Sequence, residues 1–146
     1  MTKWHEHATL LLRKAAQDQY VLEKMLDDPL APVEIFGFHA QQAAEKLLKA
    51  VLVLARRPYP RTHRLTELID LIRQSGITLP ERFEELRILS PFAVEFRYDI
   101  LPEEPESRLD KPSALGIVRE LSAFVESMLT NVQDHDEYPE SANDEA

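Results

Sequence analysis

The chain has 146 residues, 44% of them hydrophobic, which is enough for one domain with an apolar core. It contains no cysteine, and this excludes a disulfide framework, a thiolate zinc site and a cysteine nucleophile. The formal net charge is −9, yet residues 1–100 hold 14 basic and 14 acidic side chains, whereas residues 101–146 hold 3 and 12. The acidity therefore lies in the last third of the chain and does not exclude an anionic ligand elsewhere.

Apolar side chains recur every three or four residues from Lys3 to about Leu26, a spacing that predicts one face of a helix. They are Trp4, Ala8, Leu11, Ala15, Leu22 and Met25. Asp18 falls where this stripe requires a core residue. An ionised carboxylate is costly to bury alone, so Asp18 is expected either to reach solvent at the rim or to pair with a cation such as Lys46 or Arg97.

A second helix is predicted from about Pro32 to Arg56. Its inward residues are expected to be Phe36, Ala40, Ala43, Leu47, Val51 and Leu54. The candidate ligand-binding residues on another of its faces are His39, Gln42, Lys46 and Lys49. Lysines suit phosphate, and histidine transfers a proton near neutral pH. The alternatives are an ordinary solvated face and, since Glu45 and Lys49 are four residues apart, a local helix-stabilising pair.

The segment RRPYPRTH follows this helix and cannot be helical, because it is rich in proline. Residues 46–66 contain six Lys or Arg side chains and no acid. His63 and several arginines lie close to Tyr59 here, a combination that can hold phosphate and stack on a base. The alternative for Arg56 and Arg57 is that they complement the C-terminal dipole of the helix.

Three more helices are expected in the rest of the chain. Thr62 is the predicted N-cap of the third, which Gly76 ends. The fourth begins near Pro80, and Pro91 predicts a kink or a break after Ser90. Asp110 is the predicted N-cap of the last helix. The apolar residues of these helices are Leu65, Leu68, Ile69 and Ile72, then Phe83, Leu86, Leu89, Ala93 and Phe96, then Ala114, Ile117, Leu121, Phe124, Met128 and Val132.

The sequence shows no alternating strand pattern and no internal repeat, so the predicted fold is all-α. We expect an up-and-down antiparallel bundle of about five helices over residues 1–132, followed by an acidic, disordered tail over residues 133–146. Three scattered glycines form no phosphate loop, and no histidine pair has metalloprotease spacing. No cofactor and no metal are therefore expected. The chain has neither a signal-peptide core nor a membrane-spanning run, which predicts a cytoplasmic protein without membrane contact.

With these residues in view, the chain resembles the HEPN domain family, the nucleotide-binding helical domain of higher eukaryotes and prokaryotes. The similarity covers roughly residues 4–132 and is strongest in FHAQQAAEKLLKA, residues 38–50. Weaker similarities follow in AAQDQYVLEKML, RTHRLTELI and FRYD, which carry Asp18, His63, Arg97 and Tyr98. The resemblance implies that the polar residues of the second helix face a cleft and often a neighbouring subunit. It also implies a small nucleotidyltransferase partner in a toxin–antitoxin-like module.

Ribonuclease members of the family use an arginine and a histidine separated by four to six residues. After Arg97 these positions hold Pro102, Glu103 and Glu104, so the motif is absent. We therefore interpret the chain as a dimeric, non-catalytic module that binds a nucleotide, RNA or another phosphorylated ligand. Its predicted site residues are Asp18, His39, Gln42, Lys46, Lys49, His63, Arg97 and Tyr98. The alternatives are a metal-independent ribonuclease that uses His39 or His63 with Arg97, and a polar cleft that serves only as a protein interface.

Overall fold

The computed structural model describes residues 2–93 and 109–134, and every regular element in these ranges is helical. The elements are α1 (Lys3–Met25), α2 (Val33–Leu54), α3 (Leu65–Gln74), the 3₁₀ helix η1 (Glu81–Phe92) and α4 (Lys111–Asp134). The all-α prediction is therefore confirmed.

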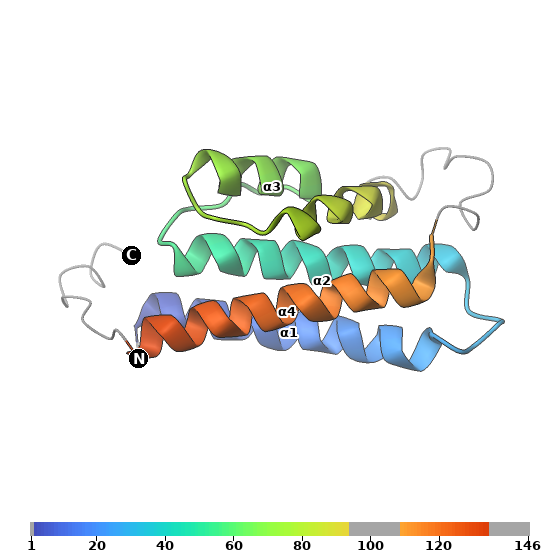
Figure 1. Ribbon diagram of the computed structural model, residues 1–146. Helices are drawn as coiled ribbons and strands as arrows, with labels where there is room; N and C mark the ends of the chain where they lie inside the picture. The colour runs from blue at the N-terminus through green and yellow to red at the C-terminus, as the bar shows by residue number, and fades with distance from the viewer. Residues whose placement is uncertain (1, 94–108, 135–146) are drawn as a thin grey trace.

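Three long helices, α1, α2 and α4, lie side by side, and α3 and η1 lie together on the opposite side of α2 (Figure 1). The chain runs along α1, returns along α2, and later follows α4 in the same direction as α2. Contacts at the helix ends agree with this path. The Arg56 guanidinium lies 5.8 Å from the Trp4 ring, and Lys111 Nζ donates to the carbonyl of Ala31 at 3.2 Å. Helix α2 contacts every other element, so it is the central helix of the bundle.

The core is built around α2. All six residues predicted to face inward from this helix are buried, as are the four of α3. Gly37 lets the Phe92 ring of η1 lie directly against α2, because a Cβ atom at position 37 would lie 2.3 Å from Cδ1 of Phe92. A larger residue at position 37 would push η1 away from the central helix.

The helix ends have identifiable caps. The Thr2 hydroxyl accepts the N–H of His5 at 3.1 Å, and Asp110 accepts the N–H of Ser113 at 3.2 Å, which makes Asp110 the N-cap predicted for α4. At the end of α2, the N–H of Arg57 reaches the carbonyl of Leu52 at 2.8 Å, and Arg56 has a φ of 61°. This is a Schellman turn with arginine at the left-handed position that glycine usually takes.

Two predictions about helix ends were wrong. Thr62 does not cap α3, which begins at Leu65, because its hydroxyl donates to Glu67 and accepts the N–H of Arg64 instead. The fourth helix is a 3₁₀ helix, and it continues past Ser90 to Phe92, so the break that was one of the two alternatives predicted from Pro91 does not occur. Its buried residues are Phe83, Leu86, Leu89 and Phe92. Their spacing of three matches the three residues per turn of a 3₁₀ helix, so all four share one face.

Gly76 follows α3 with a φ of 82°, the left-handed conformation expected where glycine ends a helix. Within residues 2–93 and 109–134, the helices are too short or too polar to cross a membrane. Phe96, the acidic linker after it and the tail beyond Asp134 lie outside the described residues.

Candidate functional site

The first polar cluster lies where α1 packs against α2 and is centred on Asp18. Only 8% of this residue is exposed, although it carries a carboxylate in an apolar stripe. Asp18 Oδ1 lies 2.9 Å from His39 Nδ1, and Oδ2 accepts a hydrogen bond from Lys46 Nζ at 2.5 Å. Both partners come from α2 and remain about a quarter exposed. Asp18 thus pairs with one of its two expected cations and fixes a histidine at the surface.

A second cluster also joins one carboxylate to a lysine and a histidine, and it is centred on Glu45 of α2. Lys49 Nζ lies 2.8 Å from Glu45 Oε2, and His63 Nδ1 lies 3.0 Å from Oε1. The fully buried Gln41 also donates to Oε1, at 3.2 Å. Each buried carboxylate therefore holds one lysine and one histidine.

The electrostatics of Glu45 follow from these contacts. Burial alone would raise the pKa of this carboxyl group, but the hydrogen bond and charge of Lys49, with hydrogen bonds from His63 and Gln41, outweigh it. The pKa of Glu45 is therefore lowered from its ordinary value of 4.5. Glu45 is ionised at neutral pH and acts only as a hydrogen-bond acceptor.

The loop after α2 closes over this second cluster. The Tyr59 ring lies 5.3 Å from Lys49 Nζ, and its hydroxyl lies 3.0 Å from His7 Nε2. Burial and the negative charge of Glu45 raise the pKa of Tyr59. The basic loop predicted from the sequence therefore contacts the polar face of α2 through the Tyr59 ring as well as through His63.

The two clusters form one continuous surface along α2, because residues seven apart on a helix project in nearly the same direction. His39 and Lys46 form one such pair, and Gln42 and Lys49 form another, rotated by about 60° around the helix. Gln42 Nε2 donates to Gln41 Oε1 at 2.8 Å and so belongs to the cluster around Glu45. We call the following residues the polar strip: Asp18, His39, Gln42, Glu45, Lys46, Lys49 and His63.

The strip has no net charge when its histidines are neutral, because two lysines balance two carboxylates. Each ammonium group has three N–H donors and uses one of them on a carboxylate, so further donors remain for a ligand. Arg57 and Arg61 add positive charge from the adjoining loop, where both are exposed and form no ion pair with the residues that the structure describes. The strip and loop together therefore favour an anion.

The structure brings six of the eight predicted site residues together in the strip, and Arg97 and Tyr98 lie outside the described residues. Sequence reasoning did not include Glu45 or Gln41 in the site. Glu45 was interpreted only as a helix-stabilising partner of Lys49, a contact that is present. The available signal was its position one helical turn after two glutamines, on the most polar part of α2.

A family model for the HEPN domain matches residues 8–128, a range that contains the whole strip. The chain belongs to the HEPN domain family. No curated protein and no solved structure matched it. The parts of this HEPN domain described by the structure contain no group of three or more His, Cys, Asp or Glu side chains suited to a metal ion.

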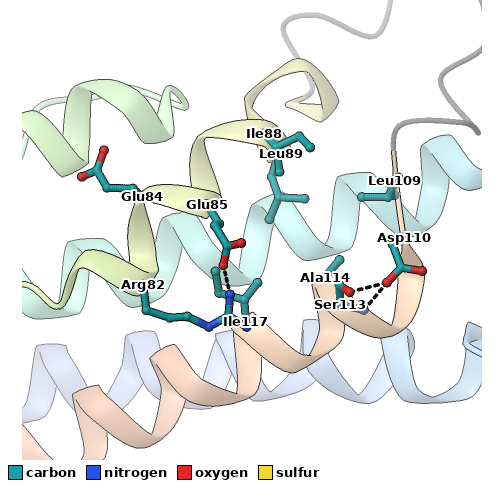
Figure 2. A pocket seen from close by; sticks show the side chains of 10 residues that line it. All are labelled: Arg82, Glu84, Glu85, Ile88, Leu89, Leu109, Asp110, Ser113, Ala114 and Ile117. Carbon is teal, nitrogen blue, oxygen red and sulfur yellow. Dashed lines mark hydrogen bonds and ion pairs between the residues drawn. The ribbon is translucent and has the colours of Figure 1, made fainter.

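A cavity of about 350 Å³ lies away from the strip, between η1 and α4 (Figure 2). Its apolar lining residues are Ile88, Leu89, Leu109, Ala114 and Ile117. Its polar lining residues already have structural partners: Arg82 pairs with Glu85 and Glu120, and Asp110 caps α4. The cavity therefore offers an apolar surface with few unused polar groups.

Proposed function

We propose that this HEPN domain binds a phosphate-bearing ligand, a nucleotide or an RNA segment, on the polar strip. The supporting observation is the repeated arrangement in which a buried carboxylate holds one histidine and one lysine. These groups are ordered before a ligand arrives, so binding costs less side-chain entropy than it would with free lysines. An ammonium donates to phosphate oxygens, and a neutral imidazole nitrogen accepts from a hydroxyl or an N–H.

Lys46 is the stronger candidate of the two lysines for direct contact. Its side chain is 24% exposed, compared with 13% for Lys49. His39 shares the carboxylate of Asp18 with Lys46, so the imidazole and the ammonium group lie close together at the surface. Arg57 and Arg61 would attract the anion from the loop, and Tyr59 offers a ring for stacking.

A charge reversal at Lys46 tests this proposal. Lys46→Glu should weaken the binding of AMP and of a short RNA by at least about tenfold in calorimetry, and wild-type affinity should fall as salt increases. Lys14→Glu is the matched control, because Lys14 is an exposed lysine of α1 outside the strip. If neither ligand binds the wild type, and Lys46→Glu instead changes the oligomeric state in sizing experiments, the strip is a protein interface and the proposal is wrong.

We further propose that the domain acts in the cytoplasm as a homodimer, together with a small nucleotidyltransferase in a toxin–antitoxin-like pair. Family membership is the main support. Exposed apolar side chains on α1 also favour a protein partner, since Leu10 is 43% and Tyr20 is 60% exposed. Light scattering at micromolar concentration should give a dimer, and co-expression with a nucleotidyltransferase encoded beside this gene should give a complex. A monomer that does not bind that protein would contradict this assignment.

A metal-independent ribonuclease is the second candidate, and the carboxylate–histidine pairs are the observation that favours it. A carboxylate that holds an imidazole in place is the arrangement used for proton transfer in several hydrolases. The test is incubation of RNA with the wild type in EDTA, beside His39→Ala, His63→Ala and Arg97→Ala. We expect no cleavage, because no histidine follows Arg97 at the ribonuclease spacing. Cleavage that is lost in Arg97→Ala and in one histidine variant would establish the enzyme.

A further inference from the structure

His63 is held to α2 at two points by residues that sequence reasoning left out of the site. Its backbone carbonyl accepts a hydrogen bond from Gln41 Nε2 at 2.7 Å, and its ring Nδ1 lies 3.0 Å from Glu45 Oε1. Gln41 is fully buried and Glu45 is 5% exposed, whereas the His63 side chain is 51% exposed. The anchors therefore lie inside the bundle, and the imidazole that they hold lies at the surface.

The charge of Glu45 determines how the imidazole is oriented. An ionised carboxylate accepts hydrogen bonds and cannot donate one, so the proton of a neutral His63 must be on Nδ1. Nε2 then carries the lone pair, and the ring fixed at Nδ1 turns this atom away from Glu45. Lys49, Gln41 and Gln42 all donate to the same carboxylate, which holds Glu45 itself in one place.

We infer that Glu45 and Gln41 are positioning residues that fix His63 as the second imidazole of the ligand site, with Nε2 presented beside Lys49. His39 is the first imidazole and is fixed in the same way by Asp18. The inference rests on the proposed function for its ligand, but the tautomer of His63 does not depend on any ligand. A ligand that spans the strip would then meet an acceptor nitrogen at each side and ammonium donors between them.

A purely structural role for Glu45 would anchor the loop without selecting a tautomer. Glu67 provides the matched control, because it also anchors this loop by accepting a hydrogen bond from the Thr62 hydroxyl at 2.9 Å, and it forms no hydrogen bond or ion pair with the His63 ring. Histidine side chains free in water favour the tautomer protonated at Nε2, so the tautomer protonated at Nδ1 in His63 is a specific signature of the carboxylate.

Long-range ¹H–¹⁵N NMR spectra of the histidine rings at pH 8 test the inference. In the wild type, His63 and His39 should both be protonated at Nδ1. Glu45→Ala should return His63 to the form protonated at Nε2 and leave His39 unchanged, whereas Glu67→Ala should change neither ring. Asp18→Asn should alter His39 alone. Protonation of His63 at Nε2 in the wild type would overturn the inference, even if Glu45→Ala did not fold.

Calorimetry with AMP separates the inference from the proposed function. Glu45→Ala should weaken binding by about tenfold, and Glu67→Ala by much less, because only the first releases the ring. If AMP does not bind the wild type but His63 is protonated at Nδ1, the positioning stands and the ligand assignment fails. If AMP binds and the two glutamate variants weaken it equally, Glu45 acts only by anchoring the loop and the inference fails.

Discussion

The polar strip and the cavity between η1 and α4 are built in opposite ways. The strip places two buried carboxylates under partly exposed histidines and lysines, while the cavity has an apolar floor and ion pairs that are mostly exposed. The cavity offers mainly an apolar lining, whereas the strip holds the groups that can recognise an anion. The apolar hollow and the groups suited to an anion therefore lie in different places in this domain.

The difference between the strip and the cavity also predicts where substitutions destabilise the fold most. Burying a carboxylate is costly, so the contacts that compensate it must be kept, whereas exposed ion pairs can exchange their partners for water. Substitutions in the strip should therefore affect stability as well as binding, and substitutions at the cavity rim should affect little of either.

Glu45→Ala should produce the largest loss of stability. It removes the acceptor shared by Lys49, Gln41 and His63, and we expect the free energy of unfolding to fall by about 2–4 kcal/mol. Urea denaturation measures this change. Glu120→Ala is the control, because Glu120 is half exposed and pairs with Arg82 at the cavity rim. Equal losses in the two variants would contradict the contrast between the regions.

Lowering the pH should remove the contribution of the Glu45 carboxylate to stability. The pKa of Glu45 is lowered in the folded state, so its contribution to stability is present above its ordinary value of 4.5 and is lost as the pH falls through the folded pKa. The stability difference between the wild type and Glu45→Gln should therefore shrink as the pH is lowered from neutral into this range. If the stability difference between the wild type and Glu45→Gln stayed constant down to the lowest pH at which the protein folds, the charge of Glu45 would contribute no stability.

Most of the fold follows from periodicity, as α2 illustrates. Its inward residues recur at helical spacing, and each one is buried. The 3₁₀ character of η1 was not predicted, because the spacing of three between Phe83, Leu86 and Leu89 also occurs on one face of an α-helix. Asp18 was recognised as exceptional because it interrupts an apolar stripe.

The sequence signal of Glu45 was weaker, because this residue also forms an ordinary i,i+4 pair with Lys49. Its fourth partner, His63, is eighteen residues further along the chain and is placed by a hydrogen bond from Gln41 to its backbone. A contact between a helix and an irregular loop leaves no periodic pattern in the sequence. This part of the site therefore required the structure.

Filling the cavity should have the smallest effect. Ala114 lines the cavity, so Ala114→Leu adds methyl groups at a position beside hollow space and should change stability by less than about 1 kcal/mol. AMP affinity should stay as in the wild type. Ala43→Leu is the control, since Ala43 is fully buried in the core and overpacking there should cost about 1–3 kcal/mol. If Ala114→Leu weakened AMP binding, the cavity would be part of the ligand site.

An NMR titration with AMP, and with inorganic phosphate beside it, tests the central claim most directly. Ligand should shift the side-chain signals of Lys46, Lys49, His39 and His63, and leave the methyl signals of Ile88, Leu89 and Ile117 at the cavity in place. That result would locate the ligand site on the strip. Shifts confined to the cavity methyl groups, or no shifts at millimolar ligand, would contradict the account.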